Sequence, residues 1–126
     1  MIIFDTLDNL ELYLSVKPEL RHVIDIMDRS LPYDQKPGSY ECPENKDVRY
    51  EVKAYLTKAD GYVPPLSEGK LNLEIILEGE SVTSIDGDNV FRMAPGRFLI
   101  TDGSQPLKRG MTQNLPVSVK SVVFSY

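Results

Sequence analysis

The chain has 126 residues, of which 41% are hydrophobic and 26% charged, and its formal net charge is −5. This length is enough to bury a core without disulfides, so we expect a single domain over residues 1–126. The negative charge argues against binding to a nucleic-acid phosphate backbone, and the absence of a long uncharged apolar run argues against a membrane-spanning helix.

The first thirty residues are predicted to be helical. Asp5 and Thr6 are suitable N-caps for a first helix over residues 7–14. Pro18 suits the first turn of a second helix. The apolar residues of this second helix recur at helical spacing: Leu20, Val23, Ile24 and Met27.

Residues 30–46 hold three prolines and one glycine and predict a connection, with a short extended piece at Ser39–Cys42. Residues 47–126 then show the period-two pattern of β-strands. In the first long strand, two rows alternate: Val48, Tyr50, Val52, Ala54 and Leu56 against Arg49, Glu51, Lys53, Tyr55 and Thr57. If the first, apolar row lines a barrel, core side chains fill the interior of that barrel.

Further strands and turns follow along the chain. Residues 59–69, with Pro64 and Pro65, predict a loop, and the segment GKLNLEIILEGE at 69–80 predicts a strand. Asp86–Asn89 predicts a hairpin turn, residues 102–105 predict a polar loop, and the chain ends in a strand. That last strand is hydrophobic on both sides, which indicates that both sides are covered, and a second subunit could supply one cover. Two helices followed by many short strands predict a mainly β, α+β protein built on a sandwich or barrel.

The chain lacks the motifs of common enzyme classes. It contains neither a glycine-rich phosphate loop nor an HExxH sequence. The only histidine, His22, is interpreted as structural, since a lone histidine is a poor general base without an orienting partner. The only cysteine, Cys42, lies in the predicted connection without a second histidine to activate it.

No feature of the sequence indicates export. With a single cysteine an internal disulfide is impossible, and we expect that a cysteine-based metal site cannot form. The first residues lack the basic segment, continuous apolar run and cleavage site of a secretory signal. We therefore expect a cytoplasmic protein.

Four segments of the chain resemble the YhcH/YjgK/YiaL family, which includes the β subunit of evolved β-galactosidase. They are MIIFDTLDNLELYL at the start, Leu77–Glu80, Pro95–Ile100 and Pro116–Val123, and together they cover nearly the whole chain in the family's order. The resemblance implies a cupin-like double-stranded β-helix, or jelly-roll barrel, with two N-terminal helices packed outside. It also implies a role in bacterial sugar catabolism, as an isomerase or anomerase of free sugars with a glutamate and histidine metal site.

The residues that would form this metal site differ from the family pattern. Tyr55 matches, but the glutamates usual around it are missing, and a histidine of the family falls near Ser67 here. Asn72 and Glu74 stand where the family has an Asp and a Gln, and the loop at 102–107 lacks its usual histidine. A cupin metal site needs about three protein ligands, so we expect no metal cofactor.

Three functions follow as hypotheses. The first is a binding, accessory or regulatory module for a sugar-like small molecule, with Asn72, Glu74 and Tyr55 in contact with the ligand. The second is a metal-independent sugar isomerase or anomerase, in which Glu74 acts as acid or base with Lys53, Tyr55 or Lys120. The third is a structural or oligomeric role as a homodimer. Under a purely structural interpretation, Asn72 and Glu74 lie on an exposed strand face.

Overall fold

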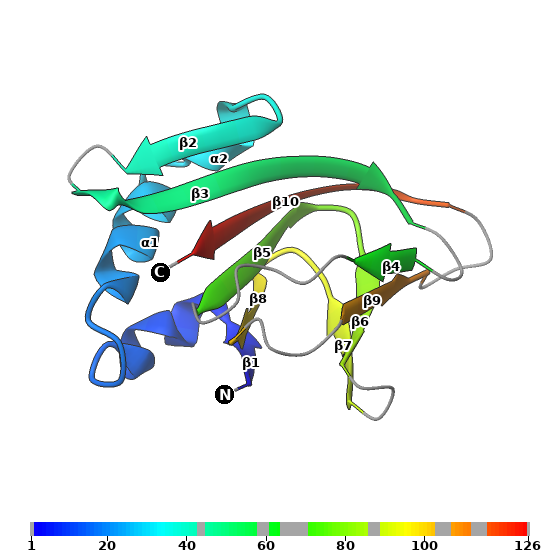
Figure 1. The fold of residues 1–126 in the computed structure, drawn as a ribbon, viewed down its shortest axis with the longest axis horizontal. Helices are drawn as coiled ribbons and strands as arrows, with labels where there is room; N and C mark the ends of the chain where they lie inside the picture. The colour runs from blue at the N-terminus through cyan, green and yellow to red at the C-terminus, as the bar shows by residue number, and fades with distance from the viewer. Residues whose placement is uncertain are drawn as a thin grey trace.

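The strands of the chain form two antiparallel sheets. The computed structural model describes residues 2–42, 45–57, 61–63, 71–85, 89–102, 107–111 and 116–125. The larger sheet contains β1 (Ile3–Thr6), β2 (Gly38–Cys42), β3 (Asn45–Leu56), β5 (Asn72–Glu78), β8 (Arg97–Thr101) and β10 (Ser118–Ser125). The smaller sheet contains β4 (Gly61–Val63), β6 (Ser81–Ile85), β7 (Asn89–Met93) and β9 (Leu107–Gly110). The strand orders are β1-β8-β5-β10-β3-β2 and β4-β9-β6-β7, and Figure 1 shows the smaller sheet at the right-hand end of β3 and β10.

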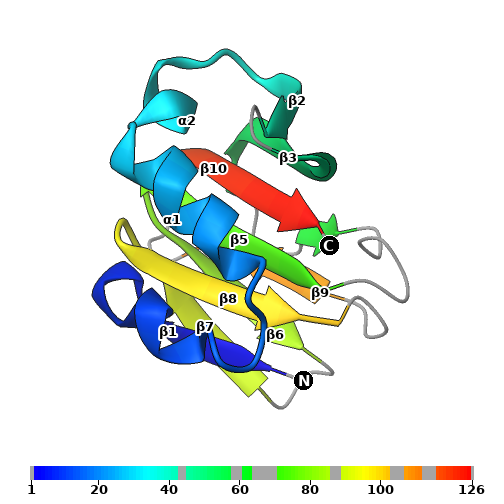
Figure 2. The ribbon, with the colours of Figure 1, turned by 90° about the vertical axis from the view of Figure 1, so that its left-hand side faces the viewer.

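Helical segments cover one face of the six-stranded sheet. η1 (Leu7–Tyr13) is a 3-10 helix, and α1 (Leu20–Asp28) and α2 (Leu31–Asp34) are α-helices. Figure 2 shows α1 crossing in front of β10, β5 and β8, with the smaller sheet behind them. The expected mainly β architecture with N-terminal helices outside it is therefore confirmed.

The prediction for the first helix is wrong in two respects. Ile3–Thr6 form β1, which pairs with β8, and the helix that follows is 3-10 rather than α. Thr6 occupies the N-cap position, but its side chain makes no capping hydrogen bond. Instead the Asp5 carboxylate accepts hydrogen bonds from Thr6 N–H at 2.7 Å, Asn9 Nδ2 at 2.9 Å and the Tyr13 hydroxyl at 2.7 Å. Asp5 thus joins β1 to the short helix.

These hydrogen bonds predict a pH dependence of stability. They hold the pKa of Asp5 below its ordinary value, with the bond from Asn9 contributing most. The contribution of Asp5 to stability is therefore complete above the pKa of the unfolded chain and is lost as the pH falls through the folded-state pKa. We expect Asp5→Asn to be less stable than the wild type at pH 7, with the difference shrinking towards pH 3. Urea unfolding at both pH values measures this, and a constant difference would contradict it.

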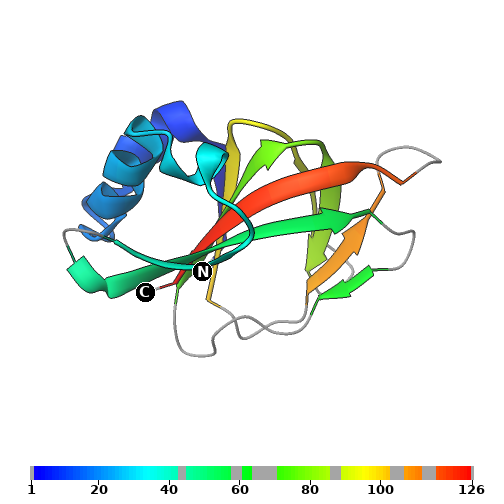
Figure 3. The same cartoon turned by 90° about the horizontal axis from the view of Figure 1, so that it is seen from above.

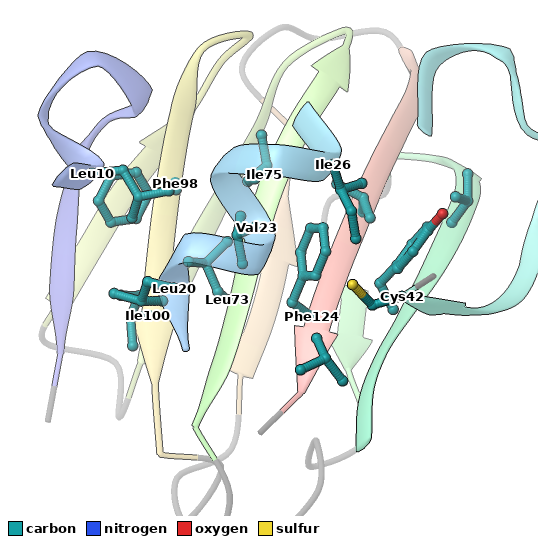
Figure 4. Packing of buried hydrophobic residues seen from close by; sticks show 14 of the residues in the cluster. Leu10, Leu20, Val23, Ile26, Cys42, Leu73, Ile75, Phe98, Ile100 and Phe124 are labelled. Atoms are coloured by element: carbon teal, nitrogen blue, oxygen red, sulfur yellow. The ribbon is translucent and has the colours of Figure 1, made fainter. Parts of the chain in front are cut away.

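The main core lies between the helices and the six-stranded sheet, and we call it the helix-side core. It contains Leu10, Leu20, Val23, Ile26, Cys42, Val48, Tyr50, Val52, Leu73, Ile75, Leu77, Phe98, Ile100, Val122 and Phe124. Figure 4 shows α1 lying over the sheet with Val23 and Ile26 directed at it. The first three residues of the apolar row of β3, Val48, Tyr50 and Val52, therefore pack under the helices, while Ala54 and Leu56 are exposed. The sequence-based idea that this row fills a barrel interior is wrong, because the helices supply its apolar cover.

A second core lies between the two sheets. It is smaller and contains Ile76, Ile85, Met93, Leu99 and Val119, with Phe4, Tyr55 and Phe91 packed against it. Residues from alternate positions of β10 thus enter both cores, which accounts for its two hydrophobic sides. The chain itself covers this strand twice, so the pattern no longer requires a second subunit. Formation of a homodimer remains a prediction.

The turn between β5 and β6 depends on Gly79, within the Leu77–Glu80 segment. Gly79 has φ +81°, and a Cβ placed there would lie 2.3 Å from the Ser118 carbonyl oxygen. Gly96 also has a positive φ, of +86°, but has no atom within 4 Å of the same position. We expect Gly79→Ala to lower the free energy of unfolding by about 2 kcal/mol or more, and Gly96→Ala by about 1 kcal/mol. Equal losses in denaturant unfolding would show that the contact with Ser118 is unimportant.

Some connections are more regular than expected. α2 lies within the predicted connection, and β4 forms part of the predicted loop at 59–69. The extended piece at Ser39–Cys42 and the hairpin strands β6 and β7 are confirmed, while the turn residues 86–88 and Ser67 lie outside the described residues. Within the described part of the chain, no helix is long and apolar enough to cross a membrane.

Candidate functional site

Buried polar side chains gather on the face of the six-stranded sheet that lies opposite the helices. Alternation along β5 places Asn72, Glu74 and Ile76 on this inner face, while Leu73 and Ile75 enter the helix-side core. β8 adds the buried Thr101, and β10 adds the buried Ser121 and the half-buried Ser125. We call Asn72, Glu74, Thr101, Ser121 and Ser125 the inner polar cluster.

Hydrogen bonds between β5 and β10 tie the inner polar cluster together. The Ser121 hydroxyl donates to Glu74 Oε2 at 3.3 Å, and the Ser125 hydroxyl donates to Asn72 Oδ1 at 2.9 Å. Thr101 is the pairing partner of Asn72 on β8. Asn72 is 1% exposed and Glu74 6% exposed, so the interpretation of these residues as an exposed strand face is wrong. They are buried because both faces of the sheet are covered.

Solvent reaches the inner face next to the inner polar cluster. Lys53 pairs with Ser121 across the β3–β10 ladder, and Glu51 pairs with Val123. Their side chains are 27% and 54% exposed, and Lys53 Nζ lies 3.9 Å from Glu51 Oε2. Figure 3, seen from above, shows β3 and β10 extending beyond the smaller sheet. The inner face of the sheet is therefore partly exposed at Lys53 and Glu51, on the strand beside β10.

Tyr55 lies on the inner face, as the sequence-based hypothesis requires, but away from Glu74. Its hydroxyl is 3.2 Å from Ser81 Oγ, and its ring packs against the core between the sheets. Nearby on β6, Thr83 is 1% exposed, and its Oγ1 has no hydrogen-bond partner among the described residues. The space between the sheets therefore holds polar groups from both sides.

Lys120 is not part of this site. Its Nζ donates a hydrogen bond to the Tyr33 carbonyl oxygen at 2.7 Å, and Tyr33 belongs to α2 on the helix side. The neighbouring residue, Ser121, is the one that points at Glu74. The proposed acid–base partnership of Glu74 with Lys120 is therefore wrong, because successive residues of a strand point to opposite faces.

The side-chain donors do not fit the metal site that the family resemblance implies. Within the inner polar cluster, the Glu74 carboxylate and the Asn72 amide are the groups other than hydroxyls that could offer oxygen to a metal. The only histidine, His22, lies on α1, on the other side of the sheet. Among the described residues, no group of three His, Cys, Asp or Glu side chains could hold a metal ion.

An apolar pocket lies elsewhere, on the helix side. It is lined by Ile3, Tyr13, Val16, Lys17, Leu20, Leu71, Leu73 and Ile100. It offers no carboxylate or amide side chain to a ligand, and Glu74 is on the opposite face of the sheet. We assign the candidate site to the inner polar cluster because polar groups there are both buried and convergent.

Comparison with known proteins identifies the fold. No protein-family model matches the chain, and no curated protein matches its sequence. A solved Neisseria meningitidis protein, NMB1881, aligns with 71% of this chain and 81% of its own, with a TM-score of 0.51 and 9% identity. The Cupin_2 domain of an XRE family transcriptional regulator from Enterobacter cloacae aligns with 71% of this chain and 96% of its own, with a TM-score of 0.50 and 17% identity.

The fold is cupin-like. A structure described as DMSP lyases RdDddP and RnDddQII also matches, with a TM-score of 0.52 and 13% identity over 64% of this chain. The match covers 39% of that lyase chain, so this cupin-like chain spans less than half of its length. At such identities the likeness concerns the fold, and the function must be argued from the side chains.

Ser121, Ser125, Thr101 and Thr83 were missed by sequence reasoning. Short hydroxyl side chains are common in strands and carry no motif of their own. The useful signal was the alternation in SVKSVVFS, which places Ser121, Val123 and Ser125 in one row. That row could have been assigned to the inner face only if the neighbour of β10 had been known to be β5.

Proposed function

We propose that this chain binds a small polyhydroxylated molecule, such as a free sugar, at the inner polar cluster. The observation that carries the proposal is the contrast between the two faces of the large sheet. Buried polar residues gather on the inner face, whereas the face under the helices is lined by apolar side chains. Burial of polar groups is tolerated when they are paired, as Glu74 is with Ser121 and Asn72 with Ser125, and such a paired set can exchange partners with the hydroxyl groups of a ligand.

The chemistry of the cluster suits hydroxyl groups. A sugar hydroxyl both donates and accepts, and the Glu74 carboxylate accepts, while the Asn72 amide and the Ser and Thr hydroxyls can do either or both. Leu99 and Val123 pair with Glu74 in neighbouring strands and add apolar surface for the C–H groups of a sugar ring. Together these groups favour a neutral or cationic polar ligand over an anionic one.

The family resemblance supports the biological setting of this proposal. In this setting, the chain is a divergent relative of the YhcH/YjgK/YiaL family that serves as a cytoplasmic binding, accessory or regulatory module of sugar catabolism and lacks the family's metal site. Elemental analysis of untagged protein after incubation with Zn²⁺, Mn²⁺ or Ni²⁺ tests whether the family's metal site is lost. About one equivalent retained per chain would contradict it.

The binding proposal is tested by ligand-detected NMR. Untagged protein is mixed with glucose and with galactose, and saturation transfer to each sugar is measured. We expect transfer to at least one of them in the wild type and in Glu78→Gln, a change at an exposed carboxylate of the same strand. No transfer to any sugar at millimolar concentration would contradict the proposal.

A second candidate is a metal-independent sugar anomerase. Lys53 and Glu74 both flank Ser121, Lys53 through strand pairing and Glu74 through a hydrogen bond, so an ammonium and a carboxylate share one side of the sheet. Ring opening needs an acid and a base near the anomeric oxygen. Faster mutarotation of α-glucose or α-galactose, lost in both Glu74→Gln and Lys53→Met, would favour this candidate over the binding module.

A further inference from the structure

The only histidine and the only cysteine of the chain meet on the helix side of the large sheet. His22 Nδ1 lies 4.0 Å from Cys42 Sγ. The Cys42 side chain, at the end of β2, is fully buried in the helix-side core, whereas His22 on α1 is half-buried. Figure 4 shows the sulfur of Cys42 on the α1 side of the sheet, beside Phe124. The imidazole therefore connects a buried sulfur with the solvent-facing surface of α1.

We propose that this pair binds one soft monovalent cation, Cu(I) or its analogue Ag(I), between Cys42 Sγ and His22 Nδ1. Thiolate sulfur is a preferred ligand of Cu(I), and imidazole also suits copper. With the bond lengths of zinc as a guide, about 2.3 Å to sulfur and 2.0 Å to nitrogen, a linear two-ligand site spans about 4.3 Å and a right-angled one about 3.0 Å. The observed separation of 4.0 Å lies between these limits and corresponds to a wide angle at the metal.

The charge of the pair selects a monovalent cation. On binding, the Cys42 thiol loses its proton and its sulfur bonds to the metal, while neutral His22 supplies the lone pair of Nδ1. One proton is released for each cation bound. A thiolate, a monovalent cation and a neutral imidazole together carry no net charge, so the apolar surroundings impose no penalty for a buried net charge.

A divalent cation fits this place less well. With the same two ligands it would leave one positive charge in the helix-side core. No third His, Cys, Asp or Glu side chain joins the pair within the described part of the chain, although Zn²⁺ normally takes four ligands. The single cysteine led us to expect that no cysteine-based metal site can form, but a two-ligand site that joins Cys42 to a histidine needs only one cysteine.

The test is a titration of untagged protein with Cu(I) under anaerobic conditions, in competition with bicinchoninate. We expect one equivalent bound per wild-type chain and an affinity at least about tenfold lower in His22→Gln, since even changes outside the ligand set weaken metal sites by about 10- to 100-fold. Arg21→Gln, at the exposed neighbouring position on α1, serves as the matched control and should bind like the wild type. Because Cys42 is in the core, its substitution can unfold the chain, so the His22 variant carries the test.

NMR of the imidazole gives a second measurement. His22 is the only histidine, so the ring nitrogen signals belong to it alone. Addition of Ag(I) is expected to shift the Nδ1 resonance and to leave Nε2 protonated. The proposal is overturned if no stoichiometric binding occurs, if His22→Gln binds as tightly as the wild type, or if Nε2 takes the metal. None of these outcomes depends on sugar binding at the inner polar cluster.

Discussion

Replacement of Glu74 by Gln is expected to weaken sugar binding by at least about tenfold, which is the loss of about 1.4 kcal/mol of binding free energy. The amide keeps the shape of the side chain and can still accept the hydrogen bond from Ser121, but the charged acceptor for ligand hydroxyls is lost. Hydrogen bonds to charged groups contribute about 1.5–3 kcal/mol each, so one lost bond accounts for this effect. Titration followed by the same saturation-transfer signal measures it.

A measurement of folding stability distinguishes a sugar-binding role of Glu74 from a structural role. The free energy of unfolding of Glu74→Gln should stay within about 1 kcal/mol of the wild type, because the amide keeps the volume of the side chain and an acceptor for the Ser121 hydroxyl. Glu78→Gln is the matched control and should change neither binding nor stability. A variant that binds sugar normally but loses several kcal/mol of stability would identify Glu74 as a structural residue.

Phe124→Ala is expected to lower the free energy of unfolding by about 3–5 kcal/mol, a large part of the total stability of a small domain. Phe124 is fully buried in the helix-side core, and its ring centroid lies 5.1 Å from that of Tyr50. It also belongs to β10, which pairs with both β3 and β5 at the centre of the sheet. Urea unfolding measures the loss of free energy. The Phe124→Ala molecules that remain folded should still bind sugar.

An exposed residue of similar chemistry provides the control for this prediction. Val90 on β7 is 62% exposed, so Val90→Ala should change stability by no more than about 0.5 kcal/mol. If Phe124→Ala costs less than about 1 kcal/mol, the helix-side core cannot be the main source of stability. The contrast between the two faces of the sheet would then lose its basis.

Local sequence patterns predicted the strands well because period-two alternation is a local property. β3, β5 and the strands of the β6–β7 hairpin could be recognised from residues that lie next to one another in the chain. The pattern in β3 could not reveal which row faces the inside of the fold. An apolar row indicates a covered face, and in this chain the cover comes from α1 rather than from the opposing sheet.

Elements that depend on distant partners were missed. β1, β4 and β9 are three or four residues long, and each is defined by pairing with a strand far along the chain. The position of Lys120 shows that the residues of the site also depend on pairing between distant strands. The sequence suggested a basic residue on the last strand, but only the register with β5 reveals that Ser121, and not Lys120, faces Glu74.

The central claim is that the inner face of the large sheet binds a sugar while the opposite face is core. Adjacent residues make this directly measurable, because Ile76 and Val123 lie on the inner face while Ile75 and Val122 lie in or against the helix-side core. We would label isoleucine and valine methyl groups with carbon-13 and titrate the protein with glucose and with galactose. Saturable shifts of the Ile76 and Val123 methyl signals, with Ile75 and Val122 unchanged, are the predicted result. Shifts confined to Ile75 and Val122, or no saturable shift with any of these sugars, would contradict the account.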